Sequence, residues 1–475
     1  MTQQAPAKEV GIDPAISKKQ IGAIYIALVT MMALSGLDQS IVATALPRIG
    51  ADFGNMAHLS WVVMGYSLAS TAVMPLYGKL SDQYGRKPLL YCAIASFLFG
   101  SILCGLATDM TQLVLFRVMQ GIGAGGFLPL AQIVIGDLVP PIERGRRQGS
   151  IAAIYATTTV IGPVLGGVIT DLLSWHWIFY INLPIGALAL LLVAKSMPAH
   201  ARTTRHKIDY LGSALLTGAI CAALLVLALG GTQWPWNGPQ VACLSLAAIV
   251  ALALLIVHIR RVAEPVLPPD LFQNRTFNIG SAVLALAFIG MMGASVFFPM
   301  LFQMVMGISP ANAGLLTVPL MVGMVLSSTI NGRLMTRGGF DYKRMQVIGL
   351  VVALCAFGVL AWAVARGAGL VFIELAIFAL GAGLGLVSPN MTIVVQQALP
   401  AARRGVGTAM LNFFRSLGGL VGVAGSGAVL AQQLQGHVHA PELYRQAIAT
   451  IFTLGTVATG LALLVLILLP KQRLP

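Results

Sequence analysis

The sequence predicts an all-α protein that crosses a membrane many times. Of its 475 residues, 57% are hydrophobic and only 9% are charged, and the mean hydropathy is +0.86. Soluble domains carry about 25% charged residues, so a water-soluble fold could not hide this much apolar side chain. Apolar runs as long as a bilayer-spanning helix recur along the whole chain. The short alternating strands of an outer-membrane barrel are not found.

Fourteen apolar segments are long enough to be spanning helices. Six come first, two lie between basic linkers, and six more follow. An even number of spans places both termini on the same side of the membrane. The expected spans are 21–45, 59–78, 89–107, 112–136, 150–172, 177–194, 210–230, 240–258, 278–301, 312–332, 345–365, 369–391, 407–430 and 447–469.

Positive charge is distributed very unevenly among the loops. Of the 29 Lys and Arg residues, Arg117 and Arg415 fall inside spans. Arg48, Arg366 and Arg445 lie on one set of loops, and all the others lie on the opposite set or the termini. Because cytoplasmic loops are enriched in Lys and Arg, both termini are expected in the cytoplasm. The same rule explains the net charge of +14 without a nucleic-acid partner.

The layout predicts two six-helix bundles joined by an inserted pair of helices. A cytoplasmic tail (1–20) precedes the first bundle (21–194), and the linkers with the inserted pair occupy 195–277. The second bundle (278–469) is followed by a short cytoplasmic tail (470–475). Paired halves of this kind are typical of transporters, whose substrate site lies near the midplane between the halves.

A short polar loop connects the second and third expected spans. Its glycines permit close backbone approach. Its charged residues place both positive and negative charge in a loop that is too short to adopt many conformations. The second half carries a degenerate copy at 332–339, in which Thr336 takes the place of Asp82. The residues that define the first loop are Gly78, Asp82, Gly85, Arg86 and Lys87.

The first span contains an acidic residue, Asp38. An ionised aspartate at the centre of a bilayer costs about 2.5–3.5 kcal/mol, so this side chain should face a cavity or a partner. A carboxyl group that can be neutral or charged is a suitable proton carrier. The alternative is a structural polar contact with a neighbouring helix.

The fourth span contains Arg117, which cannot readily lose its proton. It lies about 5 residues from the outer end of its helix, and Asp38 lies about 8 residues from the outer end of an antiparallel one. The two depths therefore differ by only about 5 Å. We expect Asp38 and Arg117 to be coupled, directly or through water; the alternative is an arginine that reaches the nearby interface.

Other polar residues inside spans are weaker candidates. Glu374, near the outer end of its span, is either a second proton site or a rim residue that reaches water. His437 and His439 are poor evidence for a metal site, and no metal is expected. With Asp38, the candidate residues of a substrate cavity are Gln39, Gln120, Tyr155 and Asn390.

Two further motifs follow in the fifth and sixth spans. A proline and several glycines make the fifth helix thin and kinked, which suits a moving interface between bundles: Gly162, Pro163, Gly166 and Gly167. The segment WHWIFYINLPIG, from Trp175 to Gly186, suits an interfacial aromatic belt.

Five patterns in this order resemble the fourteen-span drug:proton antiporter family of the major facilitator superfamily. They are LDxxIVxxALP at 37–47, GxLxDxxGRK at 78–87, RxxQGxG at 117–123, GPxxGG at 162–167 and WxWIFYINxPIG at 175–186. The chain departs from the family pattern at Gln83, Thr158 and His176.

The resemblance implies a bacterial inner-membrane exporter of amphipathic, cationic or neutral drugs, a class associated with antibiotic resistance. It implies the major facilitator fold with fourteen spans, a proton-coupling role for Asp38 and Arg117, and a conformational lock at Asp82 and Arg86. Small molecules, protons and the lipid bilayer are the expected partners, and the protein is expected to be a monomer. An exporter of a physiological metabolite (amino acid, sugar derivative or siderophore) is the alternative, because the coupling motifs do not read the substrate.

The energy source follows from what the sequence lacks. It contains no GxxxxGK[ST] loop for ATP, so the proton gradient is the expected driving force and no cofactor is expected. It also contains neither HExxH nor GxSxG, which argues against a membrane-embedded enzyme.

Overall fold

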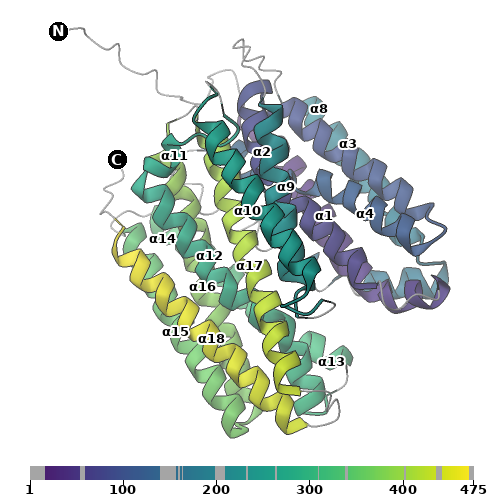
Figure 1. The fold of residues 1–475 in the computed structure, drawn as a ribbon, viewed down its shortest axis with the longest axis vertical. Coiled ribbons are helices and arrows are strands. Elements are labelled where there is room, and N and C mark those ends of the chain that lie inside the picture. Colours follow the sequence, from purple (N-terminus) through teal and green to yellow (C-terminus); the bar gives the residue numbers. More distant parts are fainter. Residues whose placement is uncertain are drawn as a thin grey trace.

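The protein is described here by a computed structural model in which two helical bundles lie side by side (Figure 1). Apart from one isolated bridge between Gly230 and Trp234, the regular structure of the described residues is helical. The structure describes residues 17–53, 59–139, 154, 157–158, 161–162, 164–197, 209–231, 234–262, 265–308, 310–336, 341–400, 403–434 and 441–469.

The N-terminal bundle, purple to blue in Figure 1, carries Asp38, Asp82 and Arg117 on its helices. Its fourth span consists of two consecutive helices, α4 and α5, which are separated by a turn at Gly125 and Gly126. The described helices are α1 (Lys18–Phe53), α2 (Leu59–Tyr84), α3 (Arg86–Gly105), α4 (Met110–Ala124), α5 (Phe127–Leu138), α7 (Trp177–Tyr180) and α8 (Asn182–Ser196).

The C-terminal bundle, green to yellow in Figure 1, begins after the short helix α11 (Asp270–Gln273). Its first helix passes beyond Pro299 into a π-helical turn, η2 (Leu301–Val305). The remaining helices are α12 (Arg275–Met300), α13 (Pro310–Leu315), α14 (Val318–Thr336), α15 (Tyr342–Arg366), α16 (Leu370–Ala398), α17 (Arg404–Leu434) and α18 (Pro441–Ile467).

Within the described residues, twelve helices are long and apolar enough to cross a membrane. The prediction of fourteen is therefore not supported by this count. One predicted span that is missing from this count is α2, a 26-residue helix. The other, 150–172, lies partly outside the described residues.

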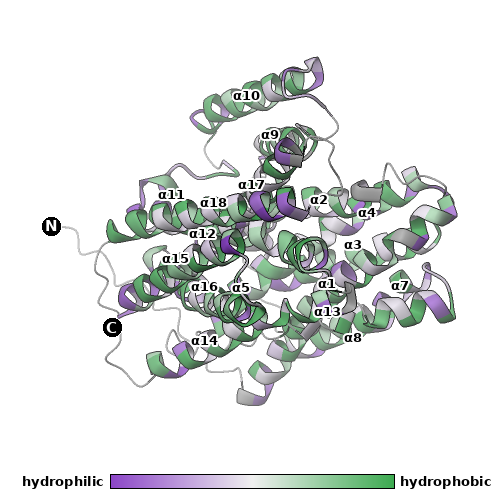
Figure 2. Ribbon diagram, turned by 90° about the horizontal axis from the view of Figure 1, so that it is seen from below, coloured by the Kyte–Doolittle hydropathy of each residue, from purple (hydrophilic) through white to green (hydrophobic). Residues whose placement is uncertain are grey.

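The inserted pair is formed by α9 (Tyr210–Leu229) and α10 (Pro239–Ile259). In Figure 2, α10 lies at the margin of the molecule, as expected for a peripheral element. In contrast, α9 packs against both α2 and α17, which belong to different bundles. The inserted pair is thus peripheral only in its second helix, and α9 covers the seam between the bundles.

Asp209 ties the inserted pair to the chain that follows it. Its carboxylate accepts hydrogen bonds from the backbone N–H groups of Gly212 (2.8 Å) and Val266 (3.2 Å) and lies 2.7 Å from Nε2 of His258. Burial by itself would raise the pKa of Asp209, but the hydrogen bonds from His258 and from the two N–H groups outweigh it and lower the pKa. The start of α9, the end of α10 and the linker are therefore held at one carboxylate.

Close helix packing in the C-terminal bundle depends on glycines where α17 crosses α12. A Cβ at Gly418 would lie 2.2 Å from the carbonyl oxygen of Ala285, and one at Gly422 would lie 2.1 Å from that of Ile289. Small residues at such crossings let helix backbones approach closely in a membrane.

We expect Gly422→Ala to destabilise the protein by about 1–3 kcal/mol, because the added methyl group overpacks against rigid backbone. Gly425→Ala is the matched control on the same helix, since nothing lies within 4 Å of a Cβ there. Thermal unfolding of both variants in detergent would measure the difference. Equal melting temperatures would show that the crossing tolerates a larger separation.

A buried carboxylate network and an inter-bundle contact

Asp38 on α1 and Arg117 on α4 form an ion pair inside the N-terminal bundle. Oδ2 of Asp38 lies 2.6 Å from Nη1 of Arg117, and the two residues are 0% and 1% exposed. A charged pair withdrawn this far from water must satisfy its remaining donors and acceptors, or it would be strongly unfavourable. The surroundings of the pair therefore determine what it can do.

Three polar side chains complete the network around the carboxylate. Oδ1 of Asp38 accepts hydrogen bonds from Gln120 (2.8 Å) and Asn182 (3.0 Å). The same two amides also donate to Oγ of Ser101, at 2.7 and 2.9 Å. Nη1 of Arg117 donates to Oε1 of Gln120 at 2.6 Å. The carboxylate on α1 is thus held by one cation and one amide from α4 and by one amide from α8, and Ser101 of α3 accepts from both amides.

Arg117 is also fixed to α2. Its Nε donates to the carbonyl oxygen of Val62 at 3.1 Å, and its guanidinium carbon lies 4.2 Å from the centre of the Tyr66 ring. The hydroxyl of Tyr66 lies 3.1 Å from Oγ of Ser35 on α1. Stacking on an aromatic face stabilises a desolvated guanidinium. The arginine therefore joins α1, α2 and α4 at one depth.

The contact between Asp38 and Arg117 that helix depth predicted is confirmed as a direct ion pair. The alternative, an arginine that reaches the interface, is wrong, because Arg117 is fully buried. Sequence reasoning missed Asn182 and Ser101. The sequence pattern places Asn182 in an interfacial aromatic belt with its neighbours, although a lone amide between apolar residues in a span is a signal that could have identified it.

The glycine motif of the fifth helix packs directly on α1. Oγ of Ser40 donates to the carbonyl oxygen of Thr158 at 2.9 Å. A Cβ on Gly162 would lie 1.9 Å from Oγ of Ser40, and one on Gly166 would lie 2.3 Å from Oγ1 of Thr44. These glycines therefore let the fifth helix approach α1 within about two turns of Asp38. Gly167 has nothing within 4 Å, and Pro163 lies outside the described residues.

The other candidate residues do not join this network. Gln39, next to the buried Asp38 on α1, is exposed. Asn390 lies in the C-terminal bundle, where it exchanges two hydrogen bonds with Asn331, at 2.8 and 3.1 Å. Glu374 is half-buried on α16 in the same bundle, and its Oε1 finds no hydrogen-bond partner among the described residues. Tyr155, like His437 and His439, lies outside the described residues.

Asp82 makes the contact that joins the two bundles. Its Oδ2 accepts a hydrogen bond from the backbone N–H of Val406, 2.9 Å away in the first turn of α17. Its Oδ1 lies 2.6 Å from Nη1 of Arg86, whose Nε donates to Asp137 at 3.0 Å. A carboxylate at a helix N-terminus satisfies a free N–H group and interacts favourably with the helix dipole. Asp82 is thus a cap supplied to one bundle by the other.

Glycines on both sides allow this close approach. A Cβ on Gly405 would lie 2.1 Å from Oδ1 of Asp82, and one on Gly78 would lie 2.4 Å from the Cβ of Ala409. Gly85 adopts φ of 90°, which side chains rarely tolerate, and this turns the chain into α3.

Lys87 has a different position from the other loop residues. Its Nζ donates to the carbonyl oxygens of Ala194 (3.0 Å) and Met197 (2.6 Å) at the end of α8, within its own bundle. Cations stabilise helix C-termini in this way. In the second copy of the loop, the side chain of Thr336 and residues 337–339 lie outside the described part of the chain.

Buried amides reinforce the contact between bundles at the same end. Asn412 on α17 donates to Oε1 of Gln132 on α5 at 2.7 Å, and Gln396 on α16 donates to the carbonyl oxygen of Gln132 at 3.2 Å. All three side chains are at most 3% exposed. The bundles are therefore closed against each other at the end that holds Asp82.

We expect Asp82→Ala to separate the bundles at this end, because loss of a helix cap costs about 0.5–2 kcal/mol. The measurement is the distance distribution between spin labels at Tyr84 and Arg403. Asp109→Ala is the matched control: Asp109 caps α4 through the N–H of Gln112 at 2.9 Å, within one bundle. The same shift in both variants, or in neither, would contradict the role of Asp82 as a lock.

Comparison with known proteins agrees with this architecture. The chain is 36% identical over 403 residues to the multidrug transporter protein MdtP of Bacillus subtilis (85% of this chain, 74% of the relative). It is 36% identical to multidrug resistance protein 3 of the same organism (86% and 79% covered). A solved structure of the proton:xylose symporter XylE superposes with a TM-score of 0.66 at 16% identity, covering 95% of this chain and 96% of that one. The model of the Major Facilitator Superfamily matches residues 28–423, and the chain therefore belongs to this superfamily of membrane transporters.

Proposed function

We propose that the protein is a proton-coupled antiporter that exports amphipathic, cationic or neutral drugs and toxic compounds by alternating access. The observation that carries the proposal is the carboxylate of Asp38, fully buried and held by Arg117, Gln120 and Asn182. Ionisable residues inside spans commonly mark proton pathways. The names of two relatives, a multidrug transporter and a multidrug resistance protein, support the substrate class.

The hydrogen-bond network around Asp38 would link protonation of this residue to a movement of the helices. While Asp38 is charged, it accepts from one guanidinium and two amides, which keeps α1, α4 and α8 together. A proton on the carboxyl group would remove the charge that holds Arg117 and leave a guanidinium buried without its counter-ion. Because an uncompensated buried charge is strongly unfavourable, the helices around it would rearrange. Proton binding and helix movement are thereby linked.

Alternating access requires a contact between bundles that can open. The bonds of Asp82 and Gln132 to α17 lie at one end of the molecule, and the bundles diverge away from that end in Figure 1. Rocking of one bundle against the other is the usual movement of transporters with paired halves.

We also propose a membrane topology for the whole chain. We infer fourteen spans: α2 packs lengthwise against α4 and α17, both candidate spans, and so shares their environment. The segment 150–172 would supply the other. Both termini would then lie in the cytoplasm, in the inner membrane of a bacterium, with the protein acting as a monomer driven by the proton gradient alone.

We expect Asp38→Asn to abolish pH-driven transport of a drug such as ethidium in proteoliposomes, while the protein still inserts. Exchange of one proton for this monovalent cation moves no net charge, so one pH unit could hold a gradient of about tenfold, and the variant should hold none. The matched control is Asp171→Asn, which removes an exposed carboxyl group from the same bundle. Unchanged transport in Asp38→Asn would refute proton carriage by this residue.

If wild-type protein moves no drug in this assay, profiling of secreted metabolites would test the alternative substrate class. Transport of an amino acid, sugar derivative or siderophore that still required Asp38 would keep the proton site and replace the substrate.

The inferred topology is tested by single cysteines in a chain without its five native ones. Tyr84 and Leu106 are exposed positions at opposite ends of α3. A membrane-impermeant thiol reagent added to intact cells should label Leu106→Cys and spare Tyr84→Cys. Labelling in the reverse order would invert the inferred orientation.

A further inference from the structure

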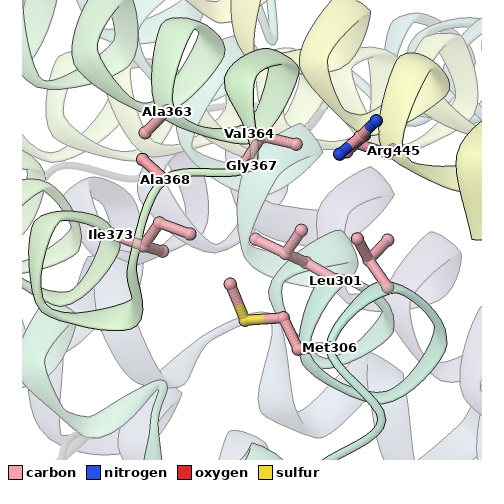
Figure 3. A pocket seen from close by; sticks show the side chains of 9 residues that line it. Leu301, Met306, Ala363, Val364, Gly367, Ala368, Ile373 and Arg445 are labelled. Atoms are coloured by element: carbon pink, nitrogen blue, oxygen red, sulfur yellow. The ribbon is translucent and has the colours of Figure 1, made fainter.

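A cavity of about 240 Å³ lies in the C-terminal bundle at the end remote from Asp82 (Figure 3). It sits where η2 leaves α12, where α15 turns into α16, and where α18 begins. Apart from one arginine, its walls are aliphatic, methionine or glycine residues: Leu301, Val305, Met306, Ala363, Val364, Gly367, Ala368 and Ile373. The volume is below that of the pockets that hold drug-sized ligands, about 300–1,000 Å³.

The exception in the lining is Arg445 of α18, whose guanidinium lies beside the turn after α15. A Cβ on Gly367 would lie 3.0 Å from Nη1 of Arg445, so the glycine leaves room for the cation. Gly367 has φ of 65° and ends α15, which fixes the turn at this position. An apolar chamber with one cation at its edge is complementary to a ligand that has a fatty chain and an anionic head group.

The donors of Arg445 are only partly used. Its Nη2 is bound to the carboxylate of Glu442, one turn earlier on α18. Its Nε is buried and has no acceptor among the described residues. Nε and Nη2 form the edge with which arginine binds carboxylate or phosphate through two parallel hydrogen bonds. An unsatisfied buried donor on a charged group is costly, so this edge calls for a second acceptor.

The charge pattern of the chain singles out the same place. Only Arg48, Arg366 and Arg445 among the Lys and Arg residues are assigned to the face opposite the termini. Two of these three converge here, because Arg366 is exposed at the last residue of α15, directly before Gly367. Positive residues are depleted on this face for topological reasons, so a local pair needs another explanation. Anionic lipid headgroups attract such basic sites next to a membrane.

We propose that this cavity binds an anionic phospholipid from the leaflet at that end, with its phosphate on Arg445 and an acyl chain between the apolar walls. The Nε–Nη2 edge of Arg445 takes the phosphate oxygens in place of Glu442, and Arg366 adds long-range attraction. A zwitterionic lipid binds more weakly, because its ammonium group cancels the attraction of the two arginines. The site lies within one bundle and is separate from the Asp38 network.

The test measures phospholipid binding to the purified full-length protein by native mass spectrometry. Phosphatidylglycerol is titrated against phosphatidylcholine, and glycerol 3-phosphate serves as a head group without chains. We expect Arg445→Gln to weaken phosphatidylglycerol binding by at least about tenfold, since it removes a charge-assisted bidentate contact. Arg48→Gln is the matched control, because it removes the third arginine of this face, on α1 of the other bundle.

Two further variants separate binding from a folding defect. Glu442→Gln removes the competing carboxylate and should strengthen phosphatidylglycerol binding several-fold, which a destabilised protein would not do. Ala363→Leu fills the apolar chamber without changing any charge and should weaken binding of the lipid. Equal binding of both lipids, or equal loss in Arg445→Gln and Arg48→Gln, would overturn the proposal. Binding of glycerol 3-phosphate as tight as that of the lipid would overturn the acyl-chain part and leave a phosphate site.

Discussion

The structure depends on one requirement: the charges of Asp38 and Arg117 are out of water and must be fully satisfied. Taking two ions out of water costs several kcal/mol for each, and only close pairing with additional hydrogen bonds offsets it. This explains why an amide on α8, a hydroxyl on α3 and a backbone carbonyl on α2 all point to the same place. The helices of the N-terminal bundle are therefore arranged around the ion pair of Asp38 and Arg117, whereas its periphery is held by ordinary apolar packing.

The second bundle has the same helical plan without that requirement. Glycines recur at 121, 123 and 125 and again at 381, 383 and 385, and each helical segment is followed by a proline, at 140 and 400. In this register Arg117 corresponds to Ile377 and Gln120 to Leu380, both buried apolar residues. The polar core of this bundle is instead the neutral pair of Asn331 and Asn390. Among the described residues, the fully buried ion pair of Asp38 and Arg117 therefore has no counterpart at the corresponding positions of the second bundle.

Helix depth and charge were readable from the sequence, but side-chain direction and long-range partners were not. The pairing of Asp38 with Arg117 followed from rise per residue along antiparallel helices, which needs no knowledge of packing. Asn182 could not be assigned in the same way, because its role depends on how α8 is rotated against α1 and α3. The partner of Asp82 was less accessible still: it is a backbone N–H of Val406, 324 positions away, and a backbone donor leaves no mark in a sequence.

One helix connects the Asp38 network to the contact between bundles. Near its start, α2 supplies the carbonyl oxygen of Val62 and the ring of Tyr66 that hold Arg117; near its end, it carries Asp82, which caps α17. Gly121 of α4 packs so tightly on Tyr66 that a Cβ on Gly121 would lie 2.4 Å from the carbonyl oxygen of Tyr66, so α2 cannot move independently of α4 at that level.

If protonation of Asp38 releases Arg117, the guanidinium must find new partners, and those available to it include the groups of α2 that it already contacts. Under this proposal, a displacement at Val62 would be carried along the 26-residue helix to a cap whose glycine neighbours leave no room for a closer approach. The two-state element that coupling requires is then α2 itself, which is bound at one end by a charge that a proton can unbalance and at the other by a hydrogen bond that either forms or does not.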